Sequence, residues 1–148
     1  MTISNDLEFK NILARLNLAQ QRQLGARFVE NVLALCMDPK VKSALDIAAR
    51  ANAGADELEA ALAAAKKASV DSFTQCGKEC DWHTQSGHFV AEAALACLKP
   101  ASSPAWEAAM HARMARTCET IALGKGTDNL EAAAQYRLLA EFMNDQGN

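Results

Sequence analysis

The chain has 148 residues, half of them hydrophobic but only 5% aromatic, and its formal net charge at pH 7 is -3. This length suits one domain with a buried core, here expected over residues 1–148. The nearly neutral charge, without a basic stripe or patch, argues against binding to nucleic acid or to a membrane surface. No apolar run approaches transmembrane length, and the N-terminus has acids where a secretory signal needs bases, so we expect a cytoplasmic protein.

Helix start signals recur along the whole chain. A polar acceptor followed three residues later by Glu or Gln has the spacing of a capping box, and it begins at Asn5, Asn17, Asp56 and Asp128. Proline at a first helical position follows Asp38 and Ser103. Glycines that could end helices are Gly54, Gly77 and Gly124. These signals predict six or seven helices, over about 6–16, 18–36, 39–53, 56–76, 81–98, 104–123 and 129–144.

Apolar residues repeat at helical spacing in three of these segments. The stripes are Leu24, Phe28, Val32 and Leu35; Trp106, Met110, Met114 and Ile121; and Leu130, Ala134 and Leu138. No segment alternates with the period of two that is typical of a strand. We therefore expect an all-α fold, a bundle or short stack of about six to seven antiparallel helices.

The stretch "QCGKECDWHTQSGHF" concentrates soft metal ligands. Cys76, Cys80 and His83 would share one face of a continuous helix, whereas His88 would point elsewhere. Cys76 and His83 would also lie about 10 Å apart along the axis, too far for one zinc ion whose ligands sit at about 2.0–2.3 Å. A metal site would thus need ligands from another helix, such as His111 or Cys118.

A structural role fits these sulfur and imidazole groups better. Phe73, Val90 and Cys97 share their face on the same helical wheel, and free cysteine is often buried. We therefore expect the groups between residues 76 and 83 to face inward as core, with all five cysteines reduced. A metal site at Cys76, Cys80 and His83, and a thiol-dependent enzyme on Cys76 or Cys80, are the alternatives.

Trp82 and Phe89 are seven residues apart and fall on one side of the predicted helix, opposite the cysteines. A helix that is apolar on two sides is either central in a bundle or carries a face for a partner. Sequence motifs for phosphate loops, serine hydrolases and zinc proteases are absent. We accordingly expect no enzyme and no cofactor.

Several phrases resemble the alanine-rich, all-helical immunity protein family of bacterial polymorphic toxin systems. "FVENVLALC" and "KSALDIAARANAGADELEAALAAAKKAS" are similar to the family's first helices, and "SGHFVAEAALA" is similar to its "GHAVATAH" phrase. "AWEAAMHARMA" resembles the helix that follows, so the similarity covers about residues 25–120. Gly87 and His88 match the most distinctive phrase. The resemblance implies a non-catalytic protein that binds and neutralises a cognate toxin.

The leading hypothesis is therefore a non-catalytic helical interaction protein that contacts its partner near Trp82 and Phe89. Alanine-rich helix faces also permit close self-association, so a homodimer is a further expectation. A mid-helix glycine such as Gly87 is unfavourable by about 1 kcal/mol relative to alanine, which predicts a close helix crossing or a helix boundary at that point.

Overall fold

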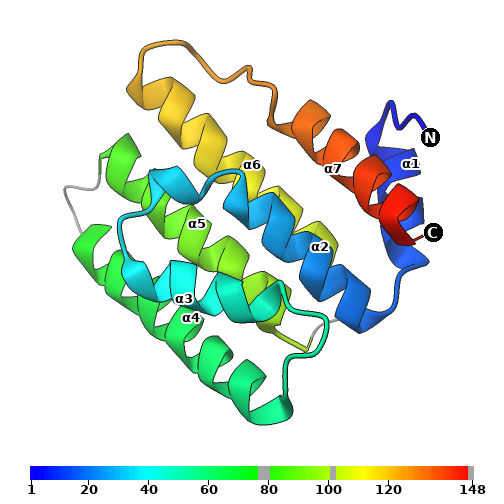
Figure 1. Cartoon of the computed structure of the whole chain (residues 1–148). Coiled ribbons are helices and arrows are strands. Elements are labelled where there is room, and N and C mark those ends of the chain that lie inside the picture. Colours follow the sequence, from blue (N-terminus) through cyan, green and yellow to red (C-terminus); the bar gives the residue numbers. More distant parts are fainter. Residues whose placement is uncertain (77–80, 101–102, 147–148) are drawn as a thin grey trace.

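The structure, a computed structural model, describes residues 1–76, 81–100 and 103–146 (Figure 1). Along these residues the helices are α1 (Asp6–Ala14), α2 (Leu18–Glu30), α3 (Pro39–Ala48), α4 (Ala55–Cys76), α5 (Trp82–Leu98), α6 (Pro104–Ala122) and α7 (Glu131–Gln146). A short 3-10 helix, η1 (Leu33–Leu35), follows α2. The described ranges contain no strand, which confirms the predicted all-α fold. None of their helices combines the length and apolarity needed to cross a membrane.

Several predicted helix starts are confirmed by their hydrogen bonds. The side chains of Asn5 and Asp38 accept from the backbone N–H groups of Glu8 and Lys40, each at 2.9 Å. Asn17 and Gln20 form a complete capping box. Ser103 precedes the predicted Pro104 but makes no side-chain cap.

The starts predicted at Asp56 and Asp128 are wrong. α4 begins one residue earlier, at Ala55, and the Glu57 side chain accepts from the Gly54 N–H at 3.1 Å. α7 begins at Glu131, whose N–H donates to the Asn129 side chain at 3.1 Å. At α7, Asn129 therefore bonds the N–H group of Glu131 that the predicted Asp128 cap would have bonded.

Two helices are shorter than predicted. α2 ends at Glu30 and the chain then forms the 3-10 helix η1, so α2 does not reach Cys36. α3 ends at Ala48, where the Arg22 guanidinium donates to the carbonyl oxygens of Ala48 and Arg50 at 3.0 and 2.6 Å. The predicted stop at Gly124 agrees with the end of α6 and a φ of 72°, while Gly77 lies outside the described residues.

One core is built mainly from alanine and lies around α5. This helix packs against α6, α4, α2, α3 and η1, so of the two alternatives for a helix that is apolar on two sides, the central position in the bundle applies (Figure 1). The small buried residues let the helices approach closely: an added Cβ at Gly25 on α2 would lie 2.9 Å from the Cβ of Cys97 on α5. We name it the alanine core; its buried alanines are Ala26, Ala44, Ala48, Ala61, Ala65, Ala68, Ala91, Ala93, Ala94, Ala96, Ala108, Ala112 and Ala115.

A second core, the aromatic core, joins α1 and α7 to α2 and α6. Its buried members include Phe9, Phe28, Leu24, Leu139 and Phe142. The Phe9 ring lies 5.6 Å from the Phe28 ring and contacts the rings of Trp106 and Tyr136. Both chain termini lie at this side of the molecule (Figure 1).

The three predicted apolar stripes have different outcomes. Leu24, Phe28 and Val32 are fully buried, as expected. On α6, Met114 is 45% exposed, because the side that packs on α5 is formed by alanines instead. Leu130 lies just before α7 and is 82% exposed, whereas Leu138 is partly buried against the aromatic core. The stripe predicted over residues 130–138 is therefore only partly correct, and the buried residues of α7 are Glu131, Gln135, Leu139 and Phe142.

Candidate functional site

The predicted cysteine–histidine cluster falls where α4 ends and α5 begins. Cys76 is the last residue of α4, and Cys80 lies outside the described residues. His83 is exposed in the first turn of α5, and Phe73 on α4 is 71% exposed. The prediction that these groups face inward along one helix is therefore wrong for His83 and Phe73, because they belong to separate helices.

The cysteines are not all reduced, which corrects a second expectation. Cys76 is disulfide-bonded, whereas Cys36, Cys97 and Cys118 are free. A disulfide sulfur is neither a thiolate ligand nor a nucleophile. Among residues 1–76, 81–100 and 103–146, no three His, Cys, Asp or Glu side chains are grouped to hold a metal ion. A metal site at Cys76, Cys80 and His83 would require a reduced Cys76, and Cys80 lies outside the described residues, so this site stays a prediction.

The free thiols are held in their protonated form. Burial raises the pKa of the Cys36 and Cys118 thiols above the ordinary value, and it raises the pKa of Cys97 to about 12. The reacting form of cysteine is the thiolate, so these three side chains are unreactive at neutral pH.

Gly87 and His88 hold α5 against its neighbours. A Cβ added at Gly87 would lie 3.2 Å from the carbonyl oxygen of Leu35, so this glycine permits the close crossing of α5 and η1. The His88 side chain faces α4: its Nδ1 lies 2.7 Å from the Ser72 Oγ. Its Nε2 lies 3.4 Å from the Glu92 carboxylate one turn further along α5.

Trp82 and Phe89 differ in exposure although both were predicted to form a partner surface. Trp82 is 46% exposed at the start of α5. Phe89 is half-buried against the alanine core, and its ring stacks on His111 of α6 with centroids 6.3 Å apart. Trp82 is therefore open to a partner, while Phe89 mainly packs between α5 and α6.

An apolar hollow of about 390 Å³ opens beside Trp82, between α5 and the outer side of α6. Among the described residues, Arg113 is the one charged residue in its wall, and its guanidinium already donates to Asp6 and Gln135. The hollow thus presents polarizable apolar surface without a charge that needs a partner. We refer to it as the Trp82 hollow; it is lined by Trp82, Met110, Arg113, Met114, Thr117, Cys118 and Ile121.

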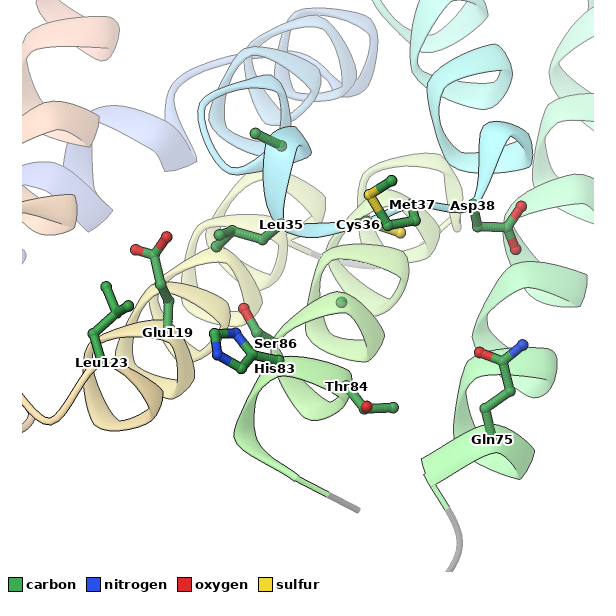
Figure 2. A pocket seen from close by; sticks show the side chains of 12 residues that line it. Leu35, Cys36, Met37, Asp38, Gln75, His83, Thr84, Ser86, Glu119 and Leu123 are labelled. Carbon is green, nitrogen blue, oxygen red and sulfur yellow. The ribbon is translucent and has the colours of Figure 1, made fainter. Parts of the chain in front are cut away.

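A second hollow, of about 470 Å³, lies at the end of the bundle where α4 and α6 end and α5 begins (Figure 2). Glu119 and Leu123 project from α6, His83 and Thr84 from α5, and Gln75 from α4 (Figure 2). We name it the end hollow; its lining is Ala34, Leu35, Cys36, Met37, Asp38, Gln75, His83, Thr84, Ser86, Gly87, Glu119 and Leu123. Because His83 follows Trp82 directly, the two hollows flank the first turn of α5.

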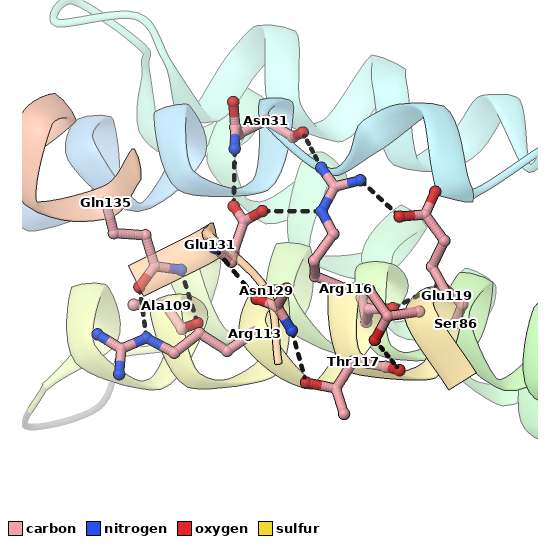
Figure 3. Close-up of polar contacts among 12 residues, drawn as sticks. Asn31, Ser86, Ala109, Arg113, Arg116, Thr117, Glu119, Asn129, Glu131 and Gln135 are labelled. Atoms are coloured by element: carbon pink, nitrogen blue, oxygen red, sulfur yellow. Dashed lines mark hydrogen bonds and ion pairs between the residues drawn. The ribbon is translucent and has the colours of Figure 1, made fainter. Parts of the chain in front are cut away.

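A network of polar side chains ties α7 to the rest of the bundle (Figure 3). The Arg116 guanidinium donates to Glu131 and Glu119 at 2.9 Å each and to the Asn31 carbonyl at 3.0 Å. Glu131 is only 3% exposed and also accepts from the Asn31 side chain at 2.7 Å. Burial lowers the pKa of Arg116, but its bonds to Glu119 and Glu131 outweigh burial and raise the pKa overall.

Arg113 makes the corresponding links to α1 and α7. Its guanidinium donates to both carboxylate oxygens of Asp6 and to the Gln135 side chain (Figure 3 shows the Gln135 bond). The Tyr136 hydroxyl donates to Asp6 at 2.7 Å. These groups satisfy one another's hydrogen-bonding capacity, so the network holds α1, α6 and α7 together.

No protein-family model, no curated protein and no solved structure matches the chain.

Proposed function

We propose that the protein is a non-catalytic binding protein that holds a partner protein at the Trp82 hollow. The observation that carries this proposal is a half-exposed tryptophan beside a cavity lined by methionine and isoleucine, in which Arg113 already bonds Asp6 and Gln135. Exposed tryptophan is enriched among the residues that dominate interface energies, and methionine adapts its shape to incoming side chains.

The surroundings of Trp82 support binding rather than chemistry. Of the residues that the structure describes, no histidine or carboxylate lines the hollow, and the pKa of its cysteine, Cys118, is raised because the thiol is buried. A nucleophile needs an adjacent base and a lowered pKa, which this wall does not provide. An anchoring side chain from a partner needs only apolar surface and space.

The resemblance to the immunity protein family suggests what the partner is. A toxin encoded beside this gene is the occupant we propose, in line with the matching phrases around Gly87 and His88. The homodimer is the competing occupant of the same surface. Size-exclusion chromatography with light scattering distinguishes the two, because a homodimer forms without any other protein.

A toxicity-rescue experiment tests the proposal. Cells that express the neighbouring toxin gene should survive when the wild-type chain is co-expressed and should die with Trp82→Ala or Met114→Ala. Leu130→Ala removes an equally apolar and more exposed side chain elsewhere, so it is the matched control and should rescue. Absence of a toxin gene, or full rescue by both hollow variants, would refute the assignment.

A further inference from the structure

The outer side of α4 carries exposed residues at the spacing of a helix that packs on a second helix. α4 lies at the outside of the bundle, where its inner side packs on α5 and α3 (Figure 1). On its solvent side, exposed residues follow one another at intervals of four, three, four and three positions. The mean interval of about 3.5 residues is the period of a helix–helix contact. We name this surface the α4 seam; it consists of Glu59, Ala63, Lys66, Val70 and Phe73.

The seam includes apolar side chains that face solvent. Val70 is 63% exposed and Phe73 is 71% exposed. Ala63 and the adjacent Ala60 are exposed as well, and such small side chains allow a second helix to approach closely. Apolar residues that are grouped in this way on one helix mark a candidate interface, but they do not identify the partner.

The charged residues of the seam do identify it. Glu59 and Lys66 are seven positions apart, about 10 Å along the axis, so they lie beyond the reach of pairs within one helix. Within the ranges that the structure describes, the ion pairs of α4 involve Glu57, Lys67 and Asp71. Glu59 and Lys66 therefore have no ion-pair partner there, and the partner of the seam has to supply one charge of each sign at the same spacing.

A second copy of the chain supplies both charges when its α4 lies antiparallel to the first. With a twofold axis beside Ala63, Glu59 of each copy lies opposite Lys66 of the other copy, and the two Ala63 residues meet between these pairs. An axis at Lys66 would bring the two lysines together, and a parallel pair would place each charge beside its own kind. Like charges that face each other across an interface are unfavourable, so the charges select the first arrangement.

The apolar end of the seam fits the same arrangement. Val70 and Phe73 then lie over the start of α4 in the second copy, where residues 53–55 are two alanines and a glycine and leave room for large side chains. Antiparallel helices also bring opposite ends of their dipoles together. The charged pairs lie between Glu59 and Lys66, more than two turns before α4 ends, so they depend only on residues of this helix.

We propose that the chain forms a weak, antiparallel homodimer through the α4 seam. One pair of helices buries at most about 1,200 Å², the size of weak and transient interfaces, so the dissociation constant should lie at about 10–500 µM. The Trp82 hollow is lined from α5 and α6, so the second copy and the partner proposed above occupy different surfaces. The dimer therefore forms whether or not a partner is held at Trp82.

Sedimentation velocity of the full chain between about 1 µM and about 1 mM tests this dimer. The wild type should change from monomer to dimer over this range. Glu59→Lys and Lys66→Glu each create a like-charge contact and should weaken self-association at least about tenfold. An equimolar mixture of the two variants should dimerise again, because each variant supplies the charge that the other lacks. Both positions are exposed, so the variants should remain folded.

Two further variants serve as controls. Lys125→Glu makes the same change of charge in the loop between α6 and α7 and should dimerise like the wild type. Trp82→Ala should do so too, and loss of the dimer in this variant would place the second copy at the Trp82 hollow and overturn the α4 seam. A wild type that stays monomeric throughout, single charge variants that dimerise like the wild type, or a mixture of them that stays monomeric would also overturn it.

Discussion

The two cores of this molecule achieve burial in opposite ways. The alanine core around α5 brings helix backbones together through small side chains, as at Gly25 and Cys97. In the aromatic core, the large side chains of Phe9, Phe28 and Phe142 keep α1 and α7 at a greater distance from the helices they pack on. Arg113 and Arg116 of α6 bond polar side chains at the edge of this core. The alanine core thus depends on small side chains, whereas the aromatic core depends on large ones.

This difference also explains the position of the proposed binding surface. α6 uses Ala108, Ala112 and Ala115 to approach α5, and the Ser86 hydroxyl even donates to the Ala115 carbonyl at 2.8 Å. Large side chains do not fit into that contact, so Met110 and Met114 lie on the outer side of α6, beside Trp82. The close packing of the alanine core thus leaves apolar residues available to a partner.

The largest expected effect comes from removing volume in the aromatic core. Phe9 is fully buried, and Phe9→Ala should lower the free energy of unfolding by about 3–5 kcal/mol, measured by urea denaturation. Leu7→Ala on the exposed side of α1 is the control and should change it by less than about 0.5 kcal/mol. Equal losses for the two variants would show that α1 does not depend on this core.

A smaller loss is expected from adding volume to the alanine core. The new Cβ of Gly25→Ala would lie 2.9 Å from the Cβ of Cys97, so the variant should be destabilised by about 1–3 kcal/mol despite the better helix propensity of alanine. Gly54→Ala adds the same atom where the nearest contact is 3.6 Å and should be close to neutral. A stabilised Gly25→Ala would contradict the close packing of α2 and α5.

The smallest effect is a pH dependence confined to the aromatic side. The hydrogen bond from Arg113 lowers the pKa of Asp6, so this carboxylate contributes stability above its unfolded pKa of about 4, and the contribution is lost as the pH falls through the lower, folded pKa. Because Asp6 is half-exposed, the contribution should be below about 1 kcal/mol.

Urea denaturation of wild type and Asp6→Asn from about pH 7 to about pH 3 measures this contribution. The wild type should be more stable at neutral pH, and the two curves should converge in acid. Asp46→Asn, which removes an exposed helix-surface ion pair with Lys42, is the control. A difference between wild type and Asp6→Asn that stays constant with pH would contradict the role of the Arg113 bond.

Local signals in the sequence predicted the helices well but not their orientations. The caps at Asn5, Asn17 and Asp38 depend only on residues within a few positions, so they were found. The side of α7 that faces the core was not predicted, because Glu131 and Gln135 are buried only through their hydrogen bonds to Arg116 and Arg113 on α6. A charged residue that is buried against arginines of another helix has the same spacing along the sequence as a charged residue on the surface, so the sequence pattern does not distinguish the two.

The candidate site was predicted in part for the same reason. Trp82 was singled out from its spacing, but Met114 was assigned to the core together with Met110, because a stripe of large apolar residues usually marks the buried side of a helix. Met110 does pack against the aromatic core, whereas Met114 is 45% exposed. The alanine side of α6 occupies that place instead. The end hollow combines η1, α4, α5 and α6, and no local pattern brings those segments together.

Calorimetric titration of the proposed partner, a purified cognate toxin, into the chain tests the central claim most directly. The account predicts that Trp82→Ala and Met114→Ala each weaken the dissociation constant at least about tenfold, while Leu130→Ala binds like the wild type. Wild-type affinity in both hollow variants, with all three proteins folded, would contradict the claim that a partner is held beside Trp82.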